Sequence, residues 1–253
     1  MASTERSPRV ELFDIPLDNV TLDEALDDVT ALCSTGRSHL IVTFNVDHLV
    51  TLQNDADFRQ AYADASMRLI DGSPIVAVAK LKRTPVKARV PGSDLMPALC
   101  ERAARDGLRT YVVGGMPEAN QLGVERLRER NPGLVIEGYS PPWGFESNPE
   151  HTADVLARIN EFQPDLLFMC TGAPKSEKWV SAHLGELGNA VAVCAGAAID
   201  FEAGTKRRAP KLVRIIGLEW AFRLAQEPRR LWHRYLVKDA AFFPMALREI
   251  RRK

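Results

Sequence analysis

A carboxylate directly follows an apolar run in the stretch "MRLIDGSP", residues 67–74. If the run forms a buried strand, Asp71 stands at its end, where partial burial raises the basicity of a carboxylate and suits it to act as a general base. Gly72 lets a ligand approach the backbone closely, and Ser73 with Pro74 suits the start of a helix. The alternative is that Asp71 only caps that helix, and the stretch alone leaves both hypotheses open.

Four polar side chains of different chemistry stand close together in "TFNVDH", directly after the apolar run 39–43. They are the hydroxyl of Thr43, the amide of Asn45, the carboxylate of Asp47 and the imidazole of His48. Such a set could bind a ligand, or it could form a polar turn that caps the next helix. The residues favour neither interpretation over the other.

Three further stretches place glycine or proline before an expected helix: "RVPGSD" (89–94), "VVGGMPEAN" (112–120) and "TGAPKSEKW" (171–179). Helix N-termini attract phosphate because their first backbone amides have no partner within the helix, so the second stretch could hold a diphosphate. In the third, Lys175 could reach a phosphate and Glu177 could accept hydrogen bonds from sugar hydroxyls. Alternatively, Glu177 only complements the helix dipole.

Several common cofactor and metal patterns are missing from the sequence. The adjacent Gly114 and Gly115 do not form the GxGxxG pattern of NAD-binding proteins, and HExxH, Walker A and GxSxG are absent. The spacing of the four cysteines matches no metal site and no disulfide framework, which indicates a reducing cytoplasm. "DAD" at 55–57 has the DxD spacing of metal-dependent sugar transferases, but it lies in a helical segment and is interpreted as a helix cap. We therefore expect no metal and no cofactor.

A regular order of elements must position these candidates. Short apolar runs at 39–43, 67–70, 109–115, 134–139, 164–170 and 190–196 are separated mostly by helical patterns. Several runs lack polar alternation, as expected for strands covered by helices on both faces. The pattern predicts an α/β fold, with a doubly wound, mostly parallel, Rossmann-like sheet. Ligands of such sheets bind beyond the carboxyl ends of the strands, where the candidate residues lie.

Charge divides the chain into two parts. The 253 residues have a formal net charge of zero, yet from Lys206 onward there are fourteen basic and four acidic residues, so this segment carries +10 and residues 1–205 carry −10. We predict a catalytic domain over 1–205 and a helical basic appendage over 206–253. Such asymmetry indicates that the appendage meets a polyanion. No uncharged run approaches the roughly 18 apolar residues that a spanning helix needs, so a membrane contact would be peripheral.

The appendage combines apolar and basic faces. Between 209 and 226, apolar residues recur at helical spacing and predict one helix; they are Val213, Ile216, Gly217, Trp220 and Leu224. Pro228 opens a second segment, in which Arg230, Arg234 and Lys238 form a basic stripe beside Trp232 and Tyr235. This composition suits the headgroup layer of an anionic membrane. A nucleic-acid-binding tail is disfavoured, because no known nucleic-acid motif is present and the charge of the body would repel phosphates. A final core helix with a solvated tail is the other alternative.

Taken together, seven stretches resemble, in the same order, the WecG/TagA/CpsF family of bacterial glycosyltransferases over about residues 10–240. They are "TFNVDH", "LIDGSPIV", "RVPGSDL", "VVGGMPEAN", "GAPKSEKW", "GAAIDFEAGTKRRAP" and "GLEWAFRLAQEPRRLWHRY". The resemblance implies transfer of a sugar from a nucleotide donor, usually UDP-linked, to a polyprenyl-diphosphate-linked acceptor sugar, with inversion and without a DxD-held metal. It places the protein in the synthesis of bacterial cell-surface polysaccharide, at the cytoplasmic face of the plasma membrane.

The resemblance also implies roles for particular residues. Asp71 matches the general base, Thr43 its partner on the acceptor side and Asn45 a neighbour of both. The residues expected to bind the nucleotide sugar are Gly72, Arg89, Gly92, Gly114, Gly115, Gly172, Pro174, Lys175, Glu177 and Asp200. Those expected to contact the diphosphate or the membrane are Arg214, Arg223, Arg230 and Arg234. Ser176 stands where the family commonly has glutamine, which leaves the donor contacts there open.

Two alternatives remain at this point. A nucleotide- or NAD-dependent sugar-modifying enzyme, such as an epimerase, is disfavoured by the missing GxGxxG and Tyr-xxx-Lys patterns. A nucleic-acid-binding function of the basic tail is less favoured still. The expected partners are the donor, the lipid-linked acceptor and an anionic membrane surface, with no nucleic acid. Away from a membrane, a second copy of the chain could cover the apolar face of the tail helix.

Overall fold

The computed structural model describes residues 8–215 and 217–252, apart from the side chains of Ile215 and Arg230. Within this part of the chain, a central eight-stranded sheet has the strand order β1-β2-β4-β3-β8-β7-β5-β6. All neighbouring strands are parallel except β1 and β2, which form an antiparallel pair. The strands are β1 (Arg9–Leu12), β2 (Ile15–Asp18), β3 (His39–Phe44), β4 (Met67–Ile70), β5 (Arg109–Gly114), β6 (Val135–Tyr139), β7 (Leu166–Cys170) and β8 (Val191–Cys194). The predicted α/β class is therefore confirmed, together with all six predicted strands.

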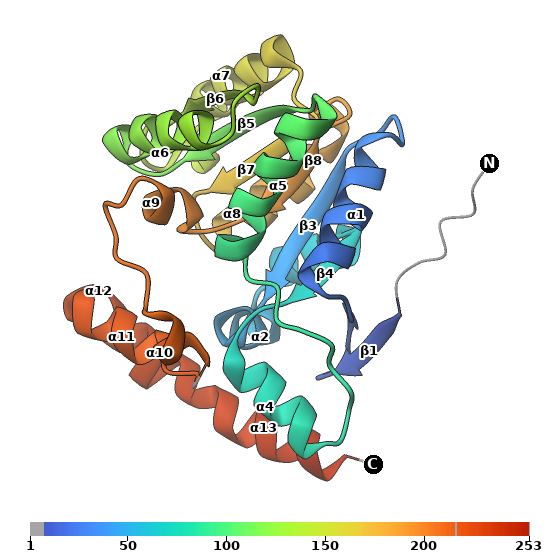
Figure 1. Ribbon diagram of the computed structural model, residues 1–253. Helices are drawn as coiled ribbons and strands as arrows, with labels where there is room; N and C mark the ends of the chain where they lie inside the picture. Colours follow the sequence, from blue (N-terminus) through green and yellow to red (C-terminus); the bar gives the residue numbers. More distant parts are fainter. Residues whose placement is uncertain (1–7, 216, 253) are drawn as a thin grey trace.

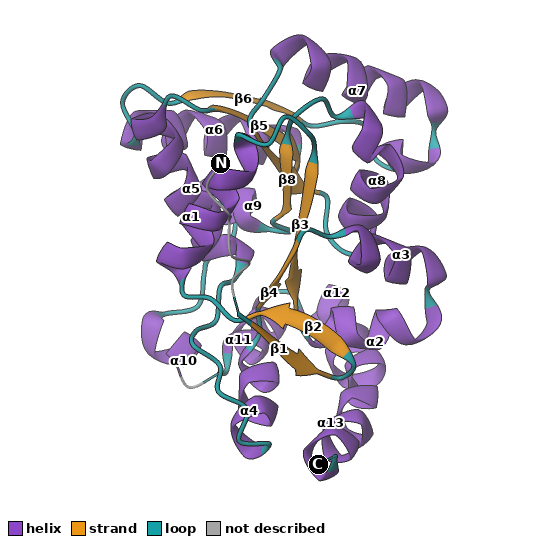
Figure 2. Cartoon of the chain, turned by 90° about the vertical axis from the view of Figure 1, so that its right-hand side faces the viewer, coloured by secondary structure: helices purple, strands orange, loops and turns teal. Residues whose placement is uncertain are grey.

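Helices cover both faces of the sheet (Figures 1 and 2). One face packs against α1 (Leu22–Cys33), α5 (Gly92–Asp106), α6 (Pro117–Arg130) and α9 (Ala198–Glu202). The other packs against α2 (Val46–Asn54), α3 (Ala56–Asp64), α4 (Ser73–Leu81), α7 (Pro149–Phe162), α8 (Lys175–His183) and α13 (Phe242–Arg251). Alternate residues of β3 divide between the two cores: Leu40 and Val42 belong to one and Ile41 to the other. This division explains why the strands read as unbroken apolar runs.

Helix starts follow the expected chemistry. Thr21 and Glu24 form a complete capping box at the start of α1. Asp55, the first residue of the "DAD" stretch, caps α3 by accepting a hydrogen bond from the Phe58 amide at 2.9 Å. The interpretation of "DAD" as a helix cap is therefore confirmed.

The β1–β2 hairpin is absent from the sequence prediction. Its two turn residues, Phe13 and Asp14, have φ values of 57° and 61°. This left-handed conformation is normally signalled by Asn-Gly or Asp-Gly, and neither pair stands here. Because the turn lacks its usual residues, the hairpin could not be recognised from local sequence.

The C-terminal segment lies across the carboxyl ends of the strands (Figure 1). It contains α10 (Lys211–Ile215), α11 (Glu219–Gln226), α12 (Pro228–Trp232), the π-helix η3 (His233–Lys238) and the 3-10 helix η4 (Asp239–Ala241), before α13. The prediction of one helix over 209–226 is wrong, because Gly217 adopts φ +80° between α10 and α11. Ile216, part of the predicted apolar face, lies outside the described residues. The predicted new segment does begin at Pro228.

Two short 3-10 helices complete the body, η1 (Phe145–Ser147) and η2 (Leu184–Glu186). Among the helices of the described chain, none has the length and apolarity to cross a bilayer.

Candidate active site

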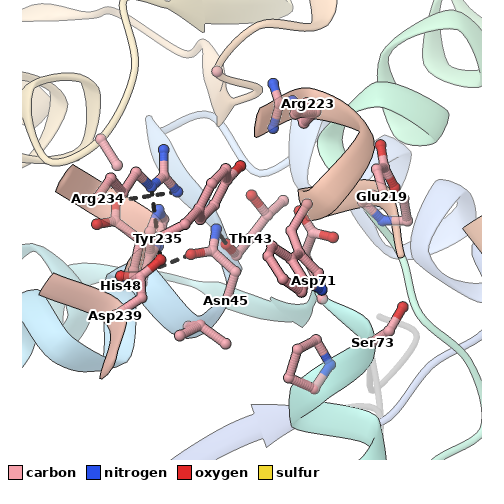
Figure 3. A pocket seen from close by; sticks show the side chains of 18 of the residues that line it. Thr43, Asn45, His48, Asp71, Ser73, Glu219, Arg223, Arg234, Tyr235 and Asp239 are labelled. Atoms are coloured by element: carbon pink, nitrogen blue, oxygen red, sulfur yellow. Dashed lines mark hydrogen bonds and ion pairs between the residues drawn. The ribbon is translucent and has the colours of Figure 1, made fainter. Parts of the chain in front are cut away.

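A cleft of about 630 Å³ lies at the carboxyl ends of β3, β4, β7 and β8. The turns after these strands form its floor, and residues of α11, α12, η3, η4 and α13 line the opposite side. Figure 3 shows Thr43, Asn45 and Asp71 from the body, with Arg223, Arg234 and Tyr235 from the C-terminal segment nearby. The cleft therefore occupies the position that a doubly wound sheet offers to a ligand.

Asp71 leaves β4 with its backbone amide donating to the Phe44 carbonyl at 2.7 Å, and its side chain lines the cleft. Gly72, not Asp71, is the N-cap of α4, so the alternative that Asp71 caps this helix is wrong. Gly72 has φ +101°, a conformation that other residues rarely adopt. Burial raises the pKa of Asp71 to about 6, with Glu219 adding to the rise and Arg89 and Arg223 opposing it. Asp71 is therefore a carboxylate suited to accept a proton near neutral pH.

The turn after β3 serves two purposes. The Asn45 side chain caps α2 by accepting from the His48 amide at 3.1 Å, and its own amide group donates to the Thr43 carbonyl at 3.3 Å. Thr43 and Asn45 also line the cleft beside Asp71. The polar-turn and ligand-site interpretations of "TFNVDH" are therefore compatible.

A buried polar group adjoins this turn. His48 Nδ1 lies 2.7 Å from the Tyr62 hydroxyl, and His48 Nε2 lies 3.7 Å from Glu177 Oε1. Burial lowers the pKa of His48 to about 3 and raises that of Glu177 to about 7. The imidazole is therefore neutral, and its contact with Glu177 is not an ion pair. Glu177 Oε2 is buried without a hydrogen-bond partner among the described residues, although Glu177 lines the cleft.

Helices α2, α4, α5 and α8 are among those that begin at the edge of the cleft. Their N-terminal amides provide partial positive charge, which favours an anionic ligand. Gly92 permits the start of α5 to approach the turn after β8, since a Cβ atom there would lie 3.0 Å from Ala195 Cα. Together with Arg89, Arg223 and Arg234, which also line the cleft, these amides could bind a diphosphate.

The predicted arginines of the C-terminal segment separate into two groups. Arg223 lies over the Phe201 ring at 5.4 Å, and Arg234 lies 3.3 Å from Asp47; both line the cleft. Arg214 instead pairs with Asp94 at 3.5 Å and does not line the cleft. The side chain of Arg230 is not among those that the structure describes.

The structure brings half of the ten predicted nucleotide-sugar residues to the cleft. Gly72, Arg89, Gly92, Gly172 and Glu177 line it, whereas Gly114, Gly115, Pro174, Lys175 and Asp200 do not. Lys175 pairs with Glu146, and Asp200 pairs with Lys206 at 2.8 Å.

The glycine turn after β5 has a packing function. A Cβ atom at Gly114 would lie 2.7 Å from the Cys170 carbonyl carbon, so this glycine lets β5 and β7 approach closely. The helix that follows, α6, borders a separate hollow with Pro117, Asn120 and Ser140. At the Ser176 position, where the family resemblance expects glutamine, the hydroxyl lies 2.8 Å from the Thr171 hydroxyl.

Sequence reasoning singled out neither Glu219 nor Asp239, and it assigned Trp220 and Tyr235 to the membrane-facing surface, although all four line the cleft. Glu219 is one of four acidic residues among fourteen basic ones from Lys206 onward, but the helix start that positions it was not predicted. Over the described residues, no three His, Cys, Asp or Glu side chains gather in an arrangement that could hold a metal ion.

Comparisons with known proteins agree with this geometry. The family described as the glycosyl transferase WecG/TagA/CpsF family matches residues 10–253. Proteins from Staphylococcus aureus strains MW2, MRSA252 and NCTC 8325 are each 26% identical over 261 aligned positions, which cover 100% of this chain and 98% of each relative. All three carry the name N-acetylglucosaminyldiphosphoundecaprenol N-acetyl-beta-D-mannosaminyltransferase. The match over nearly the whole chain, and the cleft at the strand ends, lead to one conclusion: this protein is a glycosyltransferase that belongs to the WecG/TagA/CpsF family.

Proposed function

We propose that the protein transfers a sugar, with inversion, from a UDP-linked donor to a polyprenyl-diphosphate-linked saccharide in the synthesis of bacterial cell-surface polysaccharide. The names of the S. aureus relatives, which specify a sugar transferred to a lipid-diphosphate-linked acceptor, support sugar transfer and the class of acceptor. The observation that carries the proposal is the partly desolvated carboxyl group of Asp71, which shares a cleft with helix N-termini and arginines.

The reaction is a single displacement. An acceptor hydroxyl oxygen attacks the anomeric carbon of the donor while its proton moves to Asp71. The bond from that carbon to the diphosphate oxygen breaks at the opposite face, and the nucleoside diphosphate leaves with the electron pair. The leaving group gains negative charge, which Arg89, Arg223 and the helix N-termini at the cleft stabilise in the transition state. No metal takes part in the proposed reaction, and no other cofactor is needed.

Thr43 and Asn45 hold the acceptor side of the cleft in this proposal. Their hydroxyl and amide groups lie beside Asp71, where they orient the attacking hydroxyl. The donor diphosphate lies toward Gly72, Arg89, Gly92 and Gly172. Lys175 and Asp200 lie outside the cleft, so they have no donor contact in this proposal.

We propose that residues 206–253 are a membrane-docking appendage of the catalytic part, 1–205. This segment supplies Arg223 and Arg234 to the cleft, while large apolar side chains such as Leu212, Trp232 and Phe243 remain exposed. Such a surface fits an anionic bilayer, and the protein would act peripherally at the cytoplasmic face of the plasma membrane. Away from lipid, the same surface would favour self-association.

The test is product formation with a panel of UDP-sugars and a short-chain polyprenyl-diphosphate-sugar acceptor, with and without anionic vesicles, in EDTA. Transfer from one donor, increased by vesicles and unaffected by EDTA, is the expected result. Loss of transfer in EDTA that returns with a divalent cation would contradict the metal-independent reaction. Absence of transfer from every donor would contradict the proposed substrates.

Asp71→Asn tests the base. The variant is expected to lose turnover by a factor of about 10² or more, because it cannot accept the proton, while UDP binding measured by calorimetry is retained. Turnover close to that of the wild-type enzyme would remove Asp71 from the mechanism.

A further inference from the structure

The C-terminal segment brings a carboxylate, Glu219, into the cleft. Glu219 is the first residue of α11, its side chain is 17% exposed, and its Oε2 accepts a hydrogen bond from Arg89 Nη1 at 3.4 Å. Glu219, Arg89 and Asp71 all line the cleft, and Figure 3 shows Glu219 and Asp71 together in it. A glutamate at a helix start also complements the helix dipole, but this does not explain why it is directed at Arg89.

The ion pair between Glu219 and Arg89 matters because Arg89 could otherwise pair with Asp71. Asp71 forms no ion pair with any cation of the described chain, and Arg89 makes the largest opposing contribution to its raised pKa. A guanidinium that is released from Glu219 would have Asp71 as a nearby carboxylate partner. A direct ion pair would keep Asp71 ionised but would make it a weaker base, since its proton affinity would fall.

We propose that Glu219 is a positioning residue that holds the Arg89 guanidinium away from Asp71, so that the Asp71 carboxylate remains free to accept the proton of the acceptor hydroxyl. This inference rests on the proposed function, in which Asp71 is the base. Among the described residues, groups that act electrostatically with Asp71 include Arg89, Glu219, Arg223 and the phenol of Tyr62 from α3. Of these, Glu219 and Arg223 belong to the C-terminal segment.

The position of Glu219 therefore makes the basicity of Asp71 depend on whether the C-terminal segment is packed against the body. The Trp220 ring, next to Glu219, packs against Tyr235 with their centroids 6.1 Å apart. Lys238 anchors η3 to the body through Asp47 at 2.7 Å and Thr51 at 2.8 Å. When the segment is seated, Glu219 engages Arg89; when it is displaced, Arg89 is released toward Asp71. The enzyme would thus have its full basicity only with the segment in place.

The test is a carbon-13 NMR titration of the side-chain carboxyl groups of aspartate, with the Asp71 resonance assigned by its loss in Asp71→Asn. In Glu219→Gln the pKa of Asp71 is expected to fall below the wild-type value of about 6, because a negative neighbour is lost and Arg89 is released. In Arg89→Gln it is expected to rise above that value. Glu219→Asp, which keeps the charge, should restore part of the difference. Glu227→Gln removes the same charge from the end of α11 outside the cleft and should leave the titration unchanged.

The results separate this inference from the proposed function. An Asp71 titration that is the same in Glu219→Gln and wild type, or that moves equally in Glu227→Gln, would overturn the role of Glu219. If Glu219→Gln does not fold, Glu219→Asp and Arg89→Gln provide the test, and an Asp71 pKa that is unchanged in Glu219→Asp, or unchanged or lowered in Arg89→Gln, would overturn the inference. Where transfer is measurable, the acidic limb of kcat/KM should follow the same shifts. If Asp71→Asn turns over as fast as the wild type, the assignment of Asp71 as the base is wrong, whatever the titration shows.

Discussion

At the scale of single residues, the cleft holds carboxyl groups in an environment that disfavours their ionised form. Asp71 and Glu177 both have raised pKa values, about 6 and about 7, and burial is the main cause for each. Most carboxylates of a folded protein gain partners that lower their pKa, as Asp47 does through Arg234 and Lys238. Perturbation in this direction, in a cleft at the strand ends, is typical of residues kept for chemistry and not for stability.

The pKa of Asp71 predicts the pH dependence of turnover. The base must be deprotonated to accept a proton, so kcat/KM should fall about tenfold per pH unit below about pH 6 and level off above it. Asp57→Asn, which removes a carboxylate exposed outside the cleft, should leave this limb unchanged. An acidic limb centred near pH 4, the ordinary range of an aspartate, would contradict the assignment.

The raised pKa of Glu177 predicts that the stability of the protein depends on pH. Its pKa in the folded protein, about 7, lies above its ordinary value of 4.5. Between these values the folded state binds more protons than the unfolded state, so the wild-type protein loses stability as the pH rises through this window. Glu177→Gln should therefore raise the free energy of unfolding by about 1 to 3 kcal/mol at pH 8, and this gain should vanish below pH 4.5. Urea unfolding of both proteins at the two pH values measures it; a gain equal at both would exclude titration as the cause.

At the scale of elements, the substitution Gly114→Ala tests how closely β5 packs against β7. Its φ of +103° and a Cβ position 2.7 Å from the Cys170 backbone both disfavour any side chain. Gly36 is the matched control, with φ +73° and no atom within 4 Å of its Cβ position. Gly36→Ala should cost about 1 to 2 kcal/mol for the strained backbone alone, and Gly114→Ala about 1 to 3 kcal/mol more for the clash. Equal losses in thermal or urea unfolding would show that β7 can move aside.

The same elements show what the sequence could predict. Runs such as "MRLI" and "HLIVT" identify buried strands locally, and capping residues such as Thr21 and Asp55 mark helix starts. The order of strands is not local. The turn after β5 resembled a phosphate-binding turn, but β3, β8 and β7 lie between β5 and β4, so that turn is remote from Asp71. Likewise, the chain turns at Gly217, and Glu219 beyond the turn contacts Arg89. The sequence pattern indicated one continuous helix through Gly217 and so could not predict this contact.

At the scale of the whole molecule, opposite charges join the two parts of the chain. The segment from Lys206 onward carries +10 and the rest −10. Contacts between them include Lys238 with Asp47 at 2.7 Å and Arg208 with Asp94 at 2.6 Å. Much of the basic charge and several large apolar side chains remain exposed. If the segment docks on a bilayer as proposed, it would contact the body and the lipid at the same time and bring the cleft to a lipid-linked acceptor.

Two tryptophans allow this orientation to be tested. Trp232, in α12, is 50% exposed on the C-terminal segment, whereas Trp143 is 93% exposed on the body, after β6. If the segment docks on anionic lipid, Trp232→Ala should weaken binding to phosphatidylglycerol vesicles about tenfold, the effect of losing roughly 1.4 kcal/mol of apolar burial. Trp143→Ala should bind like the wild type, although it removes the more exposed ring. Sedimentation with vesicles at low and high salt measures both effects. High salt should weaken vesicle binding by the wild type and by both variants, because basic residues supply the remaining attraction. A loss in Trp143→Ala that equals or exceeds the loss in Trp232→Ala would mean that another face of the molecule meets the membrane.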